Sequence, residues 1–280
     1  MIFNKKKYSW NDLVLNKDLS YQNKLNLLLI TYFEKDHFFY FDKKEQKLFS
    51  IIDYLIIKQK LQKLNKQRDL NLICHKKNFY NLSLKIKKGV FIPQYDTEGL
   101  IDLVLENEDN KKGLEIGVGT GAITLAIIKN SNNIMDGIDI SKKAIKLTKL
   151  NQNKNNLTKA RINFFKKDLF KLKINQKYDF IVANPPYVAF NDLFLTTEVK
   201  KIQPKKALFA AENGFLFYKY LIKNFDKFLN EDGTFYFEIG IKQELYLKKY
   251  LLQFKNLTFY FAKDLNNIVR FLIIKKSKEK

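Results

Sequence analysis

The fold class of this chain follows from one stretch of sequence, Leu114-Glu115-Ile116-Gly117-Val118-Gly119-Thr120-Gly121. A short apolar strand runs into alternating glycines, and Ala122–Lys129 follows as an apolar helix. Because glycine lets a backbone approach a bound molecule where a side chain would clash, this strand, loop and helix predict a ligand loop. Its spacing is G-x-G-x-G, whereas the dinucleotide fingerprint is G-x-G-x-x-G, which argues against a nicotinamide cofactor.

Strands and helices alternate beyond this loop. The predicted strands are Ile134–Ile140, Ile162–Lys166, Tyr178–Ala183, Gly233–Ile239, Leu257–Ala262 and Ile268–Lys275. Ser141 is a typical N-cap for a helix through Leu150, and Gly214–Leu229 has a helical pattern. The last two strands have only a turn between them and should pair antiparallel. The sequence therefore predicts an α/β fold with parallel strands and a C-terminal antiparallel hairpin.

The first third of the chain has a different pattern of residues. No glycine precedes Gly89. Two sets of apolar residues recur at helical spacing: Leu25, Leu28, Leu29, Tyr32 and Phe33, and then Leu48, Ile51, Ile52, Leu55 and Ile56. An extended stretch, Phe79–Ile86, alternates like a strand and could pair with Val90–Ile92. We therefore expect a small helical N-terminal domain over residues 1–75 that docks the substrate, an extended or hairpin linker over 76–98, and an α/β domain over 99–280.

Two aspartates follow the next strands of the predicted sheet. Asp139 ends the second strand, where an acidic side chain can accept hydrogen bonds from both hydroxyls of a ribose. Asp168 ends the third strand, where it can accept from an adenine amino group, with Leu169 beside it as an apolar wall. The alternative interpretation of each aspartate alone is a helix cap or helix start. Together with the glycine loop they indicate a nucleoside site.

These features resemble the class I S-adenosylmethionine-dependent methyltransferases, which have a Rossmann-like fold. The resemblance implies a seven-stranded sheet whose last two strands form an antiparallel hairpin, with S-adenosyl-L-methionine as the cofactor. It places that cofactor on Glu115, Gly117, Val118, Gly119, Thr120, Gly121, Asp139, Asp168, Leu169 and Asn184.

Asn184-Pro185-Pro186-Tyr187 directly follows the fourth predicted strand. The two prolines stiffen the chain and remove two backbone donors, which leaves the Asn184 oxygen and the Pro185 carbonyl as acceptors and the Tyr187 ring to stack on a planar group. Such a corner can hold both hydrogens of a planar NH2 group and direct its nitrogen toward an electrophilic methyl. We therefore predict Asn184, Pro185 and Tyr187 as catalytic and all four residues as substrate-binding.

This tetrapeptide is shared by methyltransferases of adenine N6, cytosine N4, guanine N2 and glutamine amides. Val90–Glu98 and Lys263–Arg270 resemble the domain-joining segment and terminal hairpin of the release-factor glutamine N5-methyltransferases, which also have a small helical N-terminal domain. The resemblance implies methylation of the glutamine in the Gly-Gly-Gln motif of peptide chain release factors. This sequence departs from the family at Gln94-Tyr95, where relatives have Arg-Pro, and at Leu169, where many have an aromatic residue. We expect the joining segment still to line the active site.

The formal net charge of +22 would ordinarily suggest a nucleic-acid partner. Among the 51 basic residues, however, only Arg68, Arg161 and Arg270 are arginine, the residue that pairs best with phosphate and guanine. Nucleic acid, as the substrate of an adenine N6 or guanine N2 methyltransferase, is therefore possible but not favoured. Residues 1–90 carry 19 basic and 8 acidic residues, an excess of +11 that could attract an acidic release factor.

The remaining composition narrows the class of protein. One cysteine and two histidines cannot supply the usual ligands of a structural zinc site, and no metal is predicted. The longest uncharged stretch, Ile116–Ile128, is too short to cross a bilayer, so no membrane association is expected. We expect a monomer in a bacterial cytoplasm or an organelle of bacterial ancestry.

Overall fold

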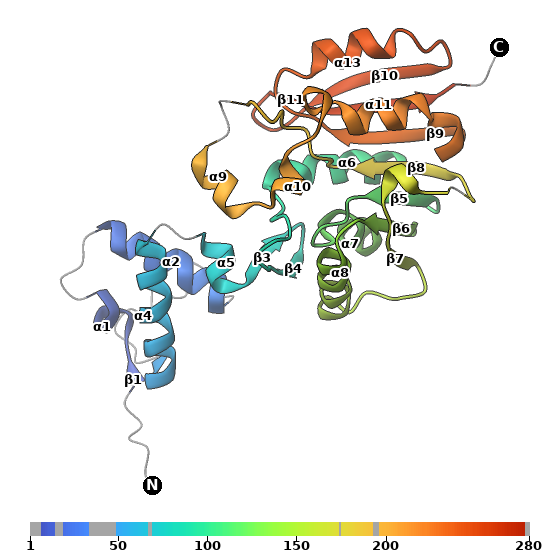
Figure 1. The fold of residues 1–280 in the computed structure, drawn as a ribbon. Coiled ribbons are helices and arrows are strands. Elements are labelled where there is room, and N and C mark those ends of the chain that lie inside the picture. The colour runs from blue at the N-terminus through green and yellow to red at the C-terminus, as the bar shows by residue number, and fades with distance from the viewer. Residues whose placement is uncertain are drawn as a thin grey trace. The chain divides into compact units, whose positions relative to one another are not determined.

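The structure is a computed structural model that describes residues 7–14, 19–33, 49–66, 69–173, 175–192 and 196–277 (Figure 1). The chain divides into two compact units, Met1–Asn78 and Phe79–Lys280. Residues 79–98, which the sequence assigns to a separate linker, therefore belong to the second unit.

The first unit is mainly helical. The elements among its described residues are β1 (Lys7–Tyr8), α1 (Trp10–Val14), α2 (Leu19–Phe33), β2 (Phe49–Ser50), α4 (Ile51–Asn65) and α5 (Leu70–Cys74). Leu25, Leu28 and Leu29 of the first predicted stripe are buried on α2, and they pack in a core with Ile57 and Leu61 of α4. The second predicted stripe is wrong, because Ile51, Ile52 and Leu55 are exposed and the buried face of α4 is formed by Ile57 and Leu61. Helix α4 begins at a capping box between Ser50 and Asp53.

A short hairpin follows, formed by β3 (Lys76–Phe79) and β4 (Leu82–Lys85). The predicted pairing of Phe79–Ile86 with Val90–Ile92 is wrong. Tyr80 and Asn81 both have positive φ, of 43° and 60°, as in a two-residue hairpin turn, and this turn brings β4 back against β3.

The second unit is built on one seven-stranded sheet. Its strands are β5 (Lys112–Ile116), β6 (Ile134–Asp139), β7 (Ile162–Lys166), β8 (Tyr178–Ala183), β9 (Leu229–Glu238), β10 (Leu257–Lys263) and β11 (Val269–Lys276). They lie in the order β10-β11-β9-β8-β5-β6-β7. The pairs from β9 to β7 are parallel, whereas β11 pairs antiparallel with both β9 and β10. The predicted seven-stranded sheet with an antiparallel C-terminal hairpin is confirmed.

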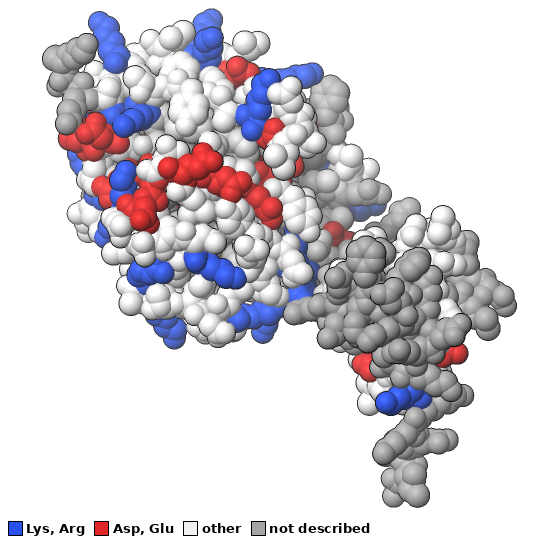
Figure 2. Space-filling model, turned by 180° about the vertical axis from the view of Figure 1, so that it is seen from behind, with Lys and Arg blue, Asp and Glu red and all other residues white. Residues whose placement is uncertain are grey.

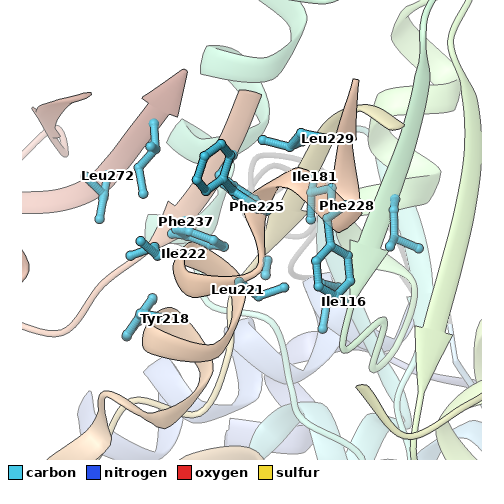
Figure 3. Packing of buried hydrophobic residues seen from close by; sticks show 14 of the residues in the cluster. Ile116, Ile181, Tyr218, Leu221, Ile222, Phe225, Phe228, Leu229, Phe237 and Leu272 are labelled. Carbon is cyan, nitrogen blue, oxygen red and sulfur yellow. The ribbon is translucent and has the colours of Figure 1, made fainter. Parts of the chain in front are cut away.

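The main core lies between the sheet and three helices. The helices of this unit are α6 (Glu98–Asn107), α7 (Ala122–Asn130), α8 (Lys142–Lys154), α9 (Thr197–Ile202), α10 (Lys205–Leu208), α11 (Leu216–Lys223), α12 (Phe225–Phe228) and α13 (Glu244–Leu251). Tyr218 and Leu221 of α11 and Phe228 of α12 pack against Ile181 and Phe237 of the sheet (Figure 3). Leu247 of α13 joins the same cluster.

One predicted helix is interrupted. Gly214–Leu229 is not a single helix, because α11 ends at Lys223 and α12 begins at Phe225. The Asn224 side chain between them donates to the Tyr220 carbonyl at 2.8 Å, and its φ of −110° is not helical. Asparagine side chains compete in this way with backbone hydrogen bonding, which accounts for the break.

The topology gathers several loops at one edge of the sheet. The parallel strands β5, β6, β7, β8 and β9 all end there, so the loops after them converge. The antiparallel strand β11 begins at the same edge, which places Arg270, near its first residue, beside the end of β9. Residues distant in sequence therefore meet at this edge.

Candidate functional site

A cavity of about 440 Å³ opens at the carboxyl ends of the parallel strands. The predicted site residues that line it are Glu115, Gly117, Val118, Gly119, Thr120, Asp139, Asp168, Leu169, Asn184 and Pro186. The structure thus brings the glycine loop and part of the tetrapeptide to one space. Gly121, Pro185 and Tyr187 lie outside this lining.

The glycines of the loop have different surroundings. Gly117, Gly119 and Gly121 all have positive φ, of 82°, 52° and 85°. A Cβ atom added to Gly117 would meet no atom within 4 Å, and one on Gly119 would meet only the Gly117 oxygen at 3.9 Å. A Cβ on Gly121 would lie 2.7 Å from Cγ2 of Thr148. The first two glycines therefore leave space for a ligand, whereas Gly121 allows close packing of α7 against α8.

Asp139 connects the glycine loop to the next strand. Its carboxylate accepts from the Gly119 N–H at 3.0 Å and from the Ser141 N–H at 2.7 Å. Burial raises the pKa of Asp139, although both backbone hydrogen bonds favour the charged form. The Ser141 side chain accepts from the Ala144 N–H, which confirms the predicted N-cap of α8. Asp139 thus fixes the loop, and each carboxylate oxygen keeps acceptor capacity toward the cavity.

Aromatic side chains form another part of the wall. Asp168 accepts from the Phe170 N–H at 3.0 Å, and Leu169 is buried. Phe170 and Phe217 both line the cavity, and their ring centroids lie 5.2 Å apart. The sequence reasoning missed both rings, although Phe170 directly follows the predicted Asp168 and Leu169. Phe170 therefore supplies the aromatic surface that Leu169 does not provide.

Glu115 is a buried acid at the start of the loop. Its carboxylate accepts from the backbone N–H and the hydroxyl of Thr124 in α7. Burial dominates over these hydrogen bonds and raises the pKa of Glu115 to about 8. The folded protein therefore keeps this carboxyl group neutral at pH values where a solvated glutamate is charged.

This raised pKa predicts how stability depends on pH. The unfolded chain releases the Glu115 proton near pH 4.5, but the folded chain holds it up to about pH 8. The free energy of unfolding should therefore fall as pH rises through this window, by up to about 1.4 kcal/mol per pH unit from this group. The free energy of unfolding of Glu115→Gln, measured by urea unfolding, should fall less between pH 5 and 8 than that of the wild type. Parallel curves for the two proteins would contradict the assignment.

The side chain of Asn184, which follows β8, is anchored on its nitrogen side. The amide nitrogen donates to Oε2 of Glu238 at 2.8 Å and to Oγ1 of Thr97 at 3.2 Å. Thr97 precedes α6, and Glu238 ends β9, so three separate segments meet at this amide. Asn184 and Thr97 also line the cavity.

Tyr187 points into the protein beside the same carboxylate. Its hydroxyl donates to Oε1 of Glu238 at 3.4 Å and accepts from Nη2 of Arg270 at 3.3 Å. The Arg270 guanidinium lies 5.8 Å from the ring centroid, so the planar partner of the Tyr187 ring is this guanidinium. Burial raises the pKa of Tyr187 to about 12. The ring supports the corner and does not form part of the cavity wall.

The backbone of the tetrapeptide is held from the opposite side. The Tyr187 carbonyl accepts from Nε2 of Gln243 at 3.1 Å, and the Gln243 oxygen accepts from the Gly240 N–H at 2.8 Å. A Cβ on Gly214 would lie 2.1 Å from the Tyr187 oxygen, so only glycine permits this approach. These contacts hold the tetrapeptide Asn184–Tyr187 rigidly against the end of β9.

Glu238 and Arg270 are site residues that sequence reasoning missed. Glu238 is buried and accepts from Oγ1 of Thr97 at 2.6 Å and from Nη2 of Arg270 at 3.1 Å, in addition to Asn184 and Tyr187. The sequence signal was an acid at the carboxyl end of an otherwise apolar strand, because a buried charge requires partners. The partners themselves come from segments that only the fold brings together.

The joining segment lines the cavity in part. Pro93 and Thr97 belong to the wall, as expected. Gln94 donates through its side chain to the Ile92 carbonyl at 2.7 Å, and Tyr95 is exposed. The departure from the family pattern at these two positions therefore lies outside the cavity lining.

Two further properties concern the described part of the chain. It contains no group of three or more histidine, cysteine, aspartate or glutamate residues placed to hold a metal ion. Among its helices, none is long and apolar enough to span a membrane.

Comparisons with known proteins agree with this geometry. Residues 81–224 match the model of the methyltransferase small domain family. A release factor glutamine methyltransferase of Fusobacterium nucleatum is 34% identical over 84% of this chain and 66% of its own length. One from Thermodesulfovibrio yellowstonii is 33% identical over 79% of this chain and 81% of its own length. The crystal structure of a methyltransferase from Pyrococcus furiosus has the same fold, with a TM-score of 0.54, 16% identity, and 70% of this chain and 90% of that chain covered.

Proposed function

Because the chain belongs to the release factor glutamine methyltransferase family, we propose that it methylates the side-chain amide nitrogen of the glutamine in the Gly-Gly-Gln motif of peptide chain release factors. The observation that carries this proposal is the shared cavity, which is lined by the glycine loop on one side and by Asn184 and Pro186 on the other. A methyl donor and an NH2 acceptor can meet in that space. In this proposal the helical unit, residues 1–75, docks the release factor.

The residues present fit S-adenosyl-L-methionine as the methyl donor. The open space above Gly117 and Gly119 suits close approach of a ligand, and Asp139 and Asp168 provide acceptors at the ends of β6 and β7. Phe170 supplies an aromatic surface beside Asp168. When bound, the cofactor supplies an electrophilic methyl group on a sulfonium.

The chain's own residues act mainly by orientation. An amide nitrogen is a weak nucleophile because its lone pair is delocalised into the carbonyl. In this proposal its two hydrogens are accepted by the oxygen of Asn184, which lines the cavity, and by the carbonyl of Pro185, which stands between the lining residues Asn184 and Pro186. These acceptors direct the nitrogen toward the methyl donor. Catalysis then comes from positioning and from electrostatic support of the positive charge that develops on nitrogen. The nitrogen that gains the methyl group loses one of its two hydrogens as a proton to water, so no histidine base is required in this arrangement.

Apolar side chains near the same edge favour a protein substrate. Phe190, three residues after the tetrapeptide, is 74% exposed and stacks on Phe209. Ile241, after β9, is 61% exposed, and Leu265, in the turn between β10 and β11, is fully exposed. Exposed aromatic and aliphatic groups suit a protein interface, whereas a nucleic-acid interface is dominated by contacts to phosphate.

A nucleic-acid amino group is the second candidate substrate. Lys167, Lys205 and Lys206 line the cavity, and lysines of this kind can contact phosphates. The basic charge is not uniform, however. Figure 2 shows acidic side chains gathered in a band across one face of the second unit, with lysines and arginines on either side of it. Such a band repels a polyanion from that face.

The substrate can be tested directly. The purified chain, incubated with S-adenosylmethionine labelled in its methyl group, should label a release factor, and replacing the acceptor glutamine should remove the label. DNA and ribosomal RNA, incubated under the same conditions, should remain unlabelled. A label that persists without the glutamine, or that appears mainly on nucleic acid, would refute the proposed substrate.

A further inference from the structure

We propose that Glu238 is a positioning residue that fixes the orientation of the Asn184 amide, so that the site accepts an NH2 group and rejects a carboxylate in its place. This inference rests on the proposed function and deepens it. It concerns how the enzyme distinguishes the acceptor glutamine from glutamate, which has nearly the same shape but cannot be methylated on nitrogen.

The first observation is that the amide nitrogen of Asn184 faces acceptors inside the protein. It donates to Oε2 of Glu238 at 2.8 Å and to Oγ1 of Thr97 at 3.2 Å, and these two acceptors lie 2.6 Å apart on the same side of the nitrogen. The amide oxygen is the acceptor that Asn184 can offer to a substrate in the cavity it lines.

The second observation is that Glu238 is an acceptor on both of its oxygens. An ionised carboxylate has no hydrogen to donate, so it can bond to the Asn184 nitrogen but not to the Asn184 oxygen. Burial raises the pKa of Glu238, whereas the hydrogen bond from Thr97 and the Arg270 guanidinium, whose Nη2 lies 3.1 Å from Oε1, favour the ionised form. Each of the four side chains that contact the carboxyl group donates to it, which is the arrangement of an ionised carboxylate. The carboxylate therefore permits only one of the two orientations of the amide.

The third observation is that the carboxylate itself is held in place. Oε1 accepts from Arg270 and Tyr187, while Oε2 accepts from Thr97 and Asn184. The Thr97 hydroxyl donates its hydrogen to Glu238 at 2.6 Å and so can only accept from Asn184. The donors of this network all point toward the Glu238 carboxylate, so the amide nitrogen of Asn184, and not its oxygen, is the atom that faces Glu238.

An oxygen held in this way selects the chemistry of the substrate. A glutamine NH2 group can donate to it, whereas a glutamate carboxylate would place oxygen against oxygen and leave both without a hydrogen. Sites that hydrogen-bond a substrate group discriminate strongly against an analogue that lacks the matching donor. In Glu238→Gln, the amide of the new side chain could donate to the Asn184 oxygen. The Asn184 amide could then also adopt the opposite orientation.

The test compares Glu238→Gln with the wild type, using two release factors that differ only by Gln or Glu at the acceptor position. The wild type should bind the Gln form at least about tenfold more tightly, since one lost hydrogen bond of this kind is worth about that factor. In Glu238→Gln this ratio should fall, because only the Pro185 carbonyl still selects for a donor, and kcat should fall about tenfold. Docking elsewhere on the factor cancels in the ratio, so general damage would not change it.

Glu108→Gln is the matched control. Glu108 is also buried and accepts from the hydroxyl of Tyr236 in β9, but it does not line the cavity. Its variant should keep the wild-type ratio and kcat. An unchanged ratio in Glu238→Gln would overturn the proposal, as would an equal loss of discrimination in Glu108→Gln.

Two further measurements keep the proposal testable if Glu238→Gln folds poorly or if release factors are not the substrate. Thr97→Ser should retain the ratio, while Thr97→Val, which lacks the hydroxyl, should reduce it. In the free protein, the side-chain NH2 signal of Asn184 in NMR spectra should exchange slowly with water and should exchange faster in Thr97→Val. Rapid exchange in the wild type would refute the orientation without any substrate, whereas failure of the proposed function alone would leave this signal protected.

Discussion

Replacing Asn184 by alanine should reduce kcat by about 10²-fold or more, because it removes a preorganised polar group at the reacting centre. The change deletes the acceptor oxygen that faces the cavity, and it also leaves Glu238 and Thr97 without their amide partner. Affinity for S-adenosylmethionine should change little, because the glycine loop, Asp139 and Asp168 are untouched. Single-turnover methylation gives the rate, and calorimetric titration with the cofactor gives the affinity.

Asn130→Ala is a suitable control for this variant. Asn130 ends α7, and its side chain donates only to the Ala126 carbonyl one turn earlier. It should keep both the rate and the affinity of the wild type. Near wild-type methylation by Asn184→Ala would show that Asn184 does not have the assigned role, and a parallel loss in both variants would indicate a general effect on folding.

Gly117→Ala and Gly121→Ala should separate ligand binding from packing. Both glycines have nearly the same φ, 82° and 85°, so alanine carries a similar backbone penalty of about 1–2 kcal/mol at either position. At Gly117 the added methyl group enters open space in the cavity, and cofactor affinity should fall at least about tenfold. At Gly121 it meets Thr148 and Leu125, and the free energy of unfolding should fall by about a further 1–3 kcal/mol.

The free energy of unfolding and the affinity for the cofactor should both be measured for Gly117→Ala and for Gly121→Ala. Urea unfolding should rank Gly121→Ala as the less stable variant, whereas cofactor titration should rank Gly117→Ala as the weaker binder. If Gly117→Ala binds the cofactor as tightly as the wild type, the open space above this glycine is not the ligand site. Equal stability of the two variants would contradict the packing role of Gly121.

The elements nearest to strong local signals could be predicted from sequence. The glycine loop, the N-cap Ser141, strand Tyr178–Ala183 and the terminal hairpin depend on short-range patterns, and all are present in the structure. The break at Asn224 was not predicted, because the apolar pattern continues through it. Periodicity indicates that a segment is helical, but it does not report where an asparagine side chain ends the helix.

The candidate site was predicted where its residues form one motif or stand at the ends of predicted parallel strands, as Asp139 and Asp168 do. The tetrapeptide was found because proline and asparagine carry their chemistry locally. Glu238 and Arg270 were missed as partners because their pairing depends on strand order, which places β9 between β8 and β11. The inward direction of Tyr187 could not be predicted either, since it follows from the guanidinium that β11 brings beneath the ring.

The antiparallel direction of β11 also has a consequence for biosynthesis. Strands β5 to β9 leave the ribosome before β11, so a nascent chain that pairs them early would bury Glu238 without the guanidinium of Arg270. An uncompensated buried carboxylate costs several kcal/mol, and its proton would then be retained. In such a chain the corner formed by Asn184–Tyr187 and Glu238 would acquire its final charge state only after the hairpin had emerged and docked.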